Sequence, residues 1–148
     1  MRILVQEAAF DFAAETEGFG AGRDDIGAIV TFTGIVRDAA EGLDHMEIEH
    51  YPGMTQKAIE AIAREAISRW SLGDALVIHR YGRLAPGEQI MMVATAARHR
   101  RDAFEAAEFL MDYLKSRAPF WKKEHGKAGA KWVAAQHSDE EALRRWKN

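Results

Sequence analysis

The chain has 148 residues and a mass of 16.6 kDa, enough for one hydrophobic core and too little for two ordinary domains. Apolar residues make up 47% of the sequence and charged residues 29%, which excludes a disordered chain, a collagen and a disulfide miniprotein. A net charge of −3 excludes attraction of the whole surface to nucleic acid, although it allows a local basic patch. We therefore expect one globular domain, residues 1–148.

The first part of the chain shows strand patterns with one weak helix between them. The expected elements are a strand at 2–6, a weak helix at 8–17, a glycine-rich loop at 18–25, a strand at 26–37 and a partner strand around 46–51. Alternating side chains along 26–37 indicate a half-buried strand. This strand carries Arg37 at its far end.

The middle of the chain holds the two strongest helix patterns. Apolar residues at spacings of three and four predict helices at 54–70 and 102–115, the second with Phe104 in its buried stripe. Asp102 followed by Glu105 predicts a capping box at the start of the second helix. Between the helices we expect strands at 75–84 and 89–98, joined by a proline-containing turn.

The last part of the chain begins at Pro119, which prevents the second helix from continuing. Strands are expected at 120–125 and 130–135, and a short helix at 138–146. The sum is an α+β domain with mostly antiparallel pairing.

Positive charge is concentrated in residues 98–131. This segment has nine basic and five acidic residues, a net charge of +4, so the remainder of the chain carries −7. Such a segment predicts an anionic ligand or an acidic partner, whereas the alternative is a solvated surface.

Lys115 and Lys122 are the strongest candidates for chemistry. Lys115 falls at the border of the second helix's apolar stripe, and Lys122 follows on an extended stretch after the turn at Pro119. Two amines held close lower each other's pKa, and a lysine tuned in this way can act as a base or a nucleophile. The alternative is that both are ordinary solvated surface lysines without a catalytic role.

His99, Arg100 and Arg37 are candidates for binding an anion. His99 and Arg100 precede a helix, where backbone N–H groups suit a phosphate, and Arg37 can clamp an anion with two hydrogen bonds. The alternatives are an ordinary strand-to-helix junction and a surface arginine.

Other site types find no support in the sequence. The chain has no cysteine, and its six histidines show no HxH or HExxH spacing, so we expect no metal site and no cofactor. No phosphate-binding loop or dinucleotide motif occurs. No signal peptide or apolar stretch of ~18 residues is found, so we expect a cytoplasmic protein without membrane association.

Five motifs in order resemble one family. TFTGIVRD (31–38), EHYPGM (49–54), IHRYGRLAPGE (78–88), RHRRDAFEA (98–106) and LKSRAPFWKKE (114–124) resemble the MoaE family, the large subunits of molybdopterin synthase. The resemblance covers residues 26–133. It implies an α/β-hammerhead fold with an additional antiparallel β subdomain.

The resemblance also implies a reaction and partners. A homodimer would dock a small ubiquitin-like thiocarboxylated subunit (MoaD type) at each end, giving a heterotetramer. The enzyme would move sulfur onto cyclic pyranopterin monophosphate to form molybdopterin, with no resident cofactor and no nucleic acid. Matched to this sequence, the catalytic residues are Lys115 and Lys122, and the substrate-binding residues are Ile35, Val36, Arg37, His99, Arg100, Lys115, Lys122, Lys123 and Glu124.

Two other functions stay open at this point. One is a non-catalytic binding module that holds a nucleotide or RNA on its basic segment, which predicts salt-sensitive binding. The other is a scaffold that recruits the small subunit and leaves the chemistry to another protein.

Overall fold

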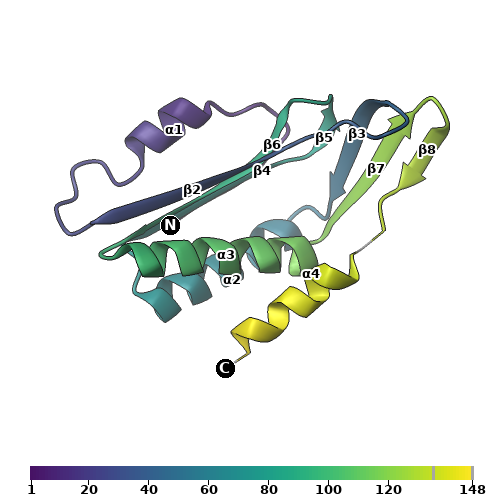
Figure 1. Ribbon diagram of the computed structural model, residues 1–148. Helices are drawn as coiled ribbons and strands as arrows, with labels where there is room; N and C mark the ends of the chain where they lie inside the picture. The colour runs from purple at the N-terminus through teal and green to yellow at the C-terminus, as the bar shows by residue number, and fades with distance from the viewer. Residues whose placement is uncertain (135, 148) are drawn as a thin grey trace.

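The computed structural model describes residues 1–134 and 136–147, and it shows two four-stranded sheets with helices packed around them (Figure 1). The elements are β1 (Arg2–Gln6), α1 (Phe12–Gly18), β2 (Ala28–Ile35), β3 (Leu43–His50), α2 (Met54–Trp70), β4 (Asp74–Arg80), β5 (Gly82–Leu84), β6 (Gln89–Ala97), α3 (Arg100–Arg117), β7 (Phe120–Gly126), β8 (Gly129–Trp132), α4 (His137–Ala142) and the 3-10 helix η1 (Leu143–Trp146).

The first sheet has the strand order β1-β4-β6-β2, in which only the β1–β4 pair is parallel. Helices α2 and α3 lie on one side of this sheet and α1 on the other (Figure 1). Because both faces are covered, the central strands β4 and β6 are buried almost throughout. The long strand β2 forms one edge of the sheet.

The second sheet has the order β5-β3-β7-β8 and is antiparallel throughout. The chain passes directly from the first sheet to the second at Tyr81, between β4 and β5. The single strand expected at 75–84 is therefore two strands, because Gly82 adopts a φ of +90°, a conformation that breaks a strand. The α+β class and the additional antiparallel sheet are confirmed.

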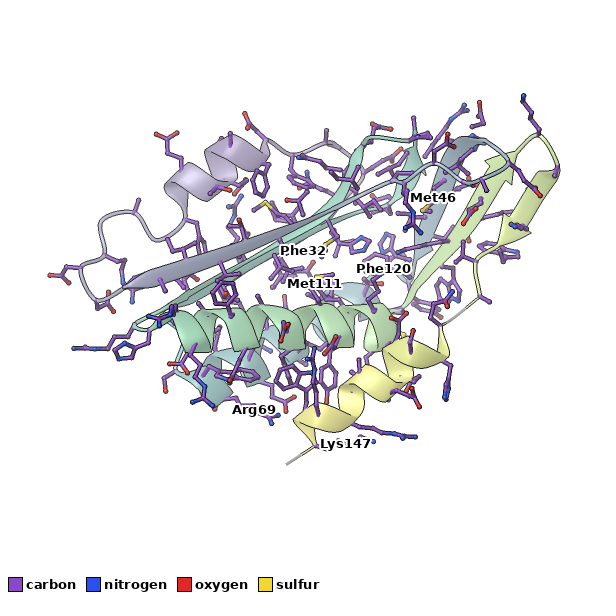
Figure 2. All side chains as sticks on the ribbon, viewed as in Figure 1. Phe32, Met46, Arg69, Met111, Phe120 and Lys147 are labelled. Carbon is purple, nitrogen blue, oxygen red and sulfur yellow. The ribbon has the colours of Figure 1, made fainter. Side chains whose placement is uncertain are left out.

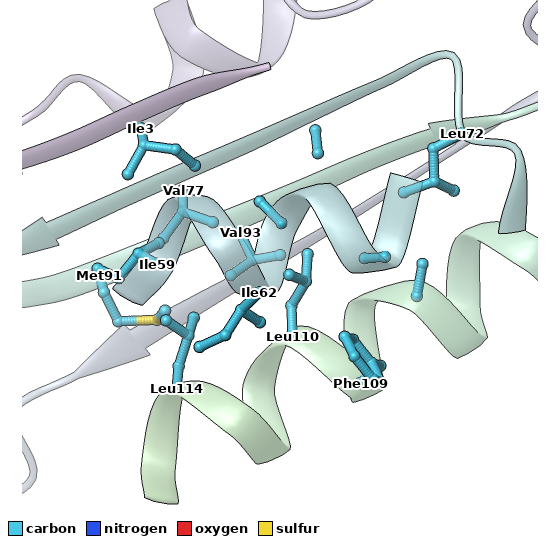
Figure 3. Close-up of a cluster of buried hydrophobic side chains, with 14 of the residues drawn as sticks. Ile3, Ile59, Ile62, Leu72, Val77, Met91, Val93, Phe109, Leu110 and Leu114 are labelled. Carbon is cyan, nitrogen blue, oxygen red and sulfur yellow. The ribbon is translucent and has the colours of Figure 1, made fainter. Parts of the chain in front are cut away.

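The main core lies between the first sheet and helices α2 and α3. Ile59 and Ile62 of α2 pack with Leu110 and Leu114 of α3 against Val93 of β6 and its neighbours (Figure 3). Val36 and Ile48 belong to the same core, so it extends from the first sheet to the second. The two sheets are thereby held together by shared apolar contacts.

The C-terminal segment is anchored to the helices by aromatic packing. Trp146 lies edge-on to both Trp70 and Phe109, with ring centroids 5.5 Å apart in each pair. Its indole N–H donates to the Asp112 carboxylate at 2.6 Å. This anchor fixes α4 beside the C-terminal end of α3 (Figure 1).

Several element boundaries differ from the expected ones. The first helix begins at Phe12 rather than residue 8, because Asp11 caps it by accepting a hydrogen bond from the Ala14 N–H. Helix α3 begins at Arg100 with His99 as its N-cap, so the capping box expected at Asp102 is wrong. Phe104 is 58% exposed, because alanines at 103, 106 and 107 face the sheet instead.

The C-terminal part also departs from the expected elements. The last helix changes to 3-10 geometry at Leu143, and β8 ends at Trp132. Residue 135, the expected end of that last strand, lies outside the described residues. Within 1–134 and 136–147, no helix is long and apolar enough to cross a membrane.

Candidate active site

Strand β7 presents Lys122 on the face of the second sheet that is turned toward the core. Lys122 pairs with Ile48 of β3, and directly opposed residues in an antiparallel ladder point to the same face. Ile48 is fully buried. The stem of Lys122 therefore lies against apolar atoms, and the side chain is half-buried.

The turn predicted at Pro119 connects the helix that carries Lys115 to the strand that carries Lys122. Helix α3 ends at Arg117, Ala118 is its C-cap, and β7 begins at Phe120. Burial lowers the pKa of Lys122, and the nearby positive charge of Lys115 lowers it further, while the Asp139 carboxylate of α4 acts in the opposite direction. The two amines thus lie close enough to influence each other, as expected from their spacing.

A stack of aromatic rings lies beneath the lysines. Phe120, two residues before Lys122 on the same face, stacks on His79 with ring centroids 3.7 Å apart and planes at 16°. His50, the register partner of Phe120, packs on Tyr81 with centroids 4.3 Å apart. Figure 2 shows Phe120 between the end of α3 and the strands of the second sheet.

His79 is a buried, neutral histidine beside the two lysines. Its Nδ1 lies 2.8 Å from the Arg80 carbonyl oxygen, which can only accept, so Nδ1 carries the hydrogen and Nε2 a lone pair. Burial lowers the pKa of His79 to about 3, the bond to Arg80 opposes this shift, and the charges of Lys122 and Lys115 add to it. The His79 ring therefore stays uncharged at neutral pH.

The buried state of His79 predicts a loss of stability in mild acid. The unfolded chain takes up a proton near the ordinary histidine pKa, whereas the native chain does so only near pH 3, so the free energy of unfolding falls as pH falls. We expect this group to contribute a fall of about 2 kcal/mol between pH 7 and pH 5. Urea unfolding at both values measures it. The fall should shrink by that amount in His79→Phe, and an unchanged pH dependence in this variant would contradict the prediction.

Arg37 follows the end of β2 on a well-defined backbone. The preceding Val36 is buried, and the Asp38 carboxylate accepts from the N–H groups of Ala39 and Leu43, which orders the loop that follows. The Arg37 side chain is exposed and has no carboxylate within 4.0 Å in the part of the chain that the structure describes. Most other arginines, such as Arg2 and Arg101, are paired.

His99 and Arg100 lie at the opposite end of α3 from Lys115. With a rise of 1.5 Å per residue, the 16 positions from His99 to Lys115 correspond to about 24 Å. Both side chains are exposed, and neither has a carboxylate within 4.0 Å among residues 1–134 and 136–147. One chain alone therefore does not bring these two residues to the lysines.

The remaining candidates on β7 point in two directions. Glu124 shares the inward face with Lys122, and it also lines a cavity of about 270 Å³ between the 39–43 loop and the β7–β8 hairpin. Lys123 lies on the outer face, where its ammonium group is 5.1 Å from the centroid of the Trp132 ring. Its role in substrate binding stays a prediction.

The comparison with known protein families is decisive for the class of this chain. Residues 5–117 match the family model described as MoaE protein. The chain belongs to the MoaE family. The molybdopterin synthase catalytic subunit of Cereibacter sphaeroides is 67% identical over 146 residues, covering 99% of this chain and 100% of that protein.

Solved structures agree with this assignment to the MoaE family. The molybdopterin biosynthesis MoaE protein of Burkholderia ambifaria superposes with a TM-score of 0.85 at 51% identity, covering 99% of this chain and 98% of that one. A complex of subunits 1 and 2 of the molybdopterin-converting factor from Helicobacter pylori contains the same fold, with a TM-score of 0.75 at 20% identity over 91% of this chain and 90% of that one.

Within this MoaE-family chain, the fold gathers some predicted residues and separates others. It brings Lys115 and Lys122 together, and it holds Val36 in the core that also contains Ile48, the partner of Lys122. Ile35 is exposed at the end of β2. Among residues 1–134 and 136–147, no group of three or more His, Asp or Glu side chains is arranged to hold a metal ion.

His50 and His79 are the site residues that sequence reasoning missed. They stand in the motifs EHYPGM and IHRYGRLAPGE, 29 positions apart, and no periodic pattern links them. The structure joins them through Phe120, which contacts both rings. The only signal in the sequence was their place in these two motifs, where each histidine lies at or near the end of a strand.

Proposed function

We propose that this chain is the catalytic subunit of a molybdopterin synthase. It transfers two sulfur atoms, one from each of two C-terminal thiocarboxylates of the small ubiquitin-like subunit, to cyclic pyranopterin monophosphate, forming the dithiolene of molybdopterin. The observation that carries the proposal is the half-buried Lys122 amine, with its lowered pKa, beside the second amine of Lys115. Membership of the MoaE family supports the substrate and the sulfur donor.

The two amines suit the steps that a thiocarboxylate requires. The thiocarboxylate sulfur forms a bond to the pterin, water adds to the acyl carbon, and the acyl C–S bond breaks, which leaves the partner's C-terminus as a carboxylate. Negative charge develops on the oxygen and the sulfur in these steps, and a nearby ammonium group stabilises it. A neutral amine of lowered pKa can take up a proton in the same step. We assign Lys115 to the carbonyl of the partner's C-terminus, and Lys122 to proton transfer and substrate binding. The absence of cysteine fits a sulfur atom supplied by the partner.

Three side chains without an acidic partner suit the phosphate of the substrate. Arg37, His99 and Arg100 have no carboxylate within 4.0 Å in the described part of the chain, so they are available to an anion. Because about 24 Å of helix separates His99 from Lys115, a shared site needs two copies of the chain. We propose a homodimer in which one copy supplies the lysines and the other supplies His99 and Arg100.

The full assembly follows from these assignments. Each lysine site receives the tail of one small subunit, giving a heterotetramer, and the tail enters as an extended peptide. We propose that residues 1–148 act as one domain, with Ile35 to Arg37 and Lys122 to Glu124 lining the substrate pocket. We further propose a cytoplasmic enzyme with no resident metal or cofactor, which binds neither nucleic acid nor membranes.

A reconstitution tests this function directly. The chain is mixed with the thiocarboxylated small subunit and cyclic pyranopterin monophosphate, and molybdopterin is measured. We expect product from the two-subunit mixture alone. A stable complex without product would favour the scaffold, and salt-sensitive binding of RNA without any complex would favour the binding module.

A further inference from the structure

We propose that Arg80 and Glu88 are positioning residues for Arg37. They fix the turn at Ala85–Glu88. This turn then holds the backbone segment from which the Arg37 side chain extends. The inference rests on the proposed function in one respect: it takes Arg37 as a ligand of the substrate phosphate.

The Arg80 guanidinium is the buried end of this arrangement. Its Nε donates to the Glu7 carbonyl at 3.1 Å, and its Nη1 donates to the Gln89 carbonyl at 3.3 Å. The same Nη1 lies 3.5 Å from Oε1 of Glu88. A buried charge persists only where it is paired and hydrogen-bonded, and Arg80, 8% exposed, meets both conditions.

The Glu88 carboxylate closes the turn that follows β5. While Oε1 faces Arg80, Oε2 accepts a hydrogen bond from the Ala85 N–H, and the Glu88 N–H donates to the Ala85 carbonyl at 3.1 Å. Pro86 and Gly87 occupy the two central positions, and Gly87 has a φ of +89°. Proline followed by a positive-φ glycine is the pattern of a type II turn.

The turn then binds the segment that carries Arg37. The Val36 N–H donates to the Glu88 carbonyl at 2.9 Å, and the Gly87 N–H donates to the Val36 carbonyl at 2.8 Å. The regular ladder between β2 and β6 is interrupted between Gly34 and Ile35, just before this point. Hydrogen bonds to the turn, rather than those of the strand ladder, therefore set the backbone path at Val36 and Arg37.

The placement of Arg37 matters because an arginine clamp acts through geometry. A guanidinium binds a phosphate with two parallel hydrogen bonds, and this requires a fixed approach of the side chain. A displacement of about 1 Å in such a group costs up to about 100-fold in rate or binding. Among residues 1–134 and 136–147, no ion pair holds the exposed Arg37 side chain, so its backbone sets that approach.

Glu88→Gln tests the proposal without unfolding the core. It removes the charge that faces Arg80 while keeping the shape of the side chain, which is partly exposed. In the assembled two-subunit enzyme we expect KM for cyclic pyranopterin monophosphate to rise about tenfold with little change in kcat. Amide hydrogen exchange at Val36 and Gly87 should become faster. Glu15→Gln, which removes the charge that pairs Glu15 of α1 with Arg2 of β1, is the matched control and should leave both readouts unchanged.

A double variant decides whether the effect passes through Arg37. If it does, Arg37→Ala with Glu88→Gln should show the same KM as Arg37→Ala alone. Multiplying effects, or an unchanged KM in Glu88→Gln, would overturn the positioning role while leaving the proposed function intact. An unchanged KM in Arg37→Ala would overturn the phosphate-binding role of Arg37 and this inference with it.

Discussion

Lys122→Ala is expected to lower the rate of molybdopterin formation by about 10²–10⁴-fold, the range for loss of a positioned acid–base group. The side chain is half-buried on the inward face of β7, and burial together with the charge of Lys115 lowers its pKa. A neutral amine is therefore more available at Lys122 than at an ordinary surface lysine. The measurement is the initial rate of molybdopterin formation with an excess of thiocarboxylated small subunit.

Lys57→Ala is the control for this prediction. Lys57 is an exposed lysine of α2 and belongs to neither of the proposed sites. Its loss should change the rate by less than about threefold, because it alters only the surface of the protein. Equal losses in the two variants would mean that the general positive charge of the protein, rather than the inward amine of Lys122, supports turnover.

The pH dependence of the rate separates the two lysines further. Because the positive charge of Lys115 lowers the pKa of Lys122, Lys115→Met should move the acid limb of the pH–rate profile to higher pH. The measurement is the pH–rate profile of the variant and of the wild type, each with saturating small subunit. A limb that stays in place would show that a group other than Lys122 controls it.

The sequence predicted those parts of the fold that local patterns determine. The bounds of α2 and the start of β7 after Pro119 agree with the expected ranges, because periodicity and proline act locally. The break at Tyr81 was not predicted, since a single glycine inside a strand pattern does not by itself mark a strand end, and the positive φ of Gly82 depends on tertiary packing. Phe104 fits the helical stripe, but three alanines take the place against the sheet.

The candidate site likewise has a part that local sequence spacing predicted and a part that depends on tertiary structure. Lys115 and Lys122 are seven residues apart and meet through one turn, so their spacing was informative. His79 comes from the first sheet and His50 from the second, and they meet at Phe120 only after both sheets have assembled. The separation of His99 from Lys115 was already implicit in the helix expected at 102–115, because a helix of that length holds its two ends far apart. The concentration of positive charge in residues 98–131 does not reveal this separation, which the observed length of α3 establishes.

That separation leads to a prediction about mixed dimers. If one copy supplies Lys122 and the other supplies Arg100, Lys122→Ala and Arg100→Ala should each be nearly inactive as pure dimers. A dimer with one chain of each kind has both substitutions in one site and neither in the other. Mixed dimers, isolated through two different affinity tags, should therefore recover about half of the wild-type rate.

The same experiment has an internal control in the chain. Mixed dimers of Lys122→Ala with Lys115→Ala place one substitution in each site, because both lysines belong to the same copy. They should stay as inactive as either parent, although they assemble equally well. Recovery in this pair, or none in the pair with Arg100→Ala, would show that the phosphate ligands and the lysines are not divided between two copies. The two groups of residues, about 24 Å apart along α3, would then have to belong to separate sites, for example one for each of two anions.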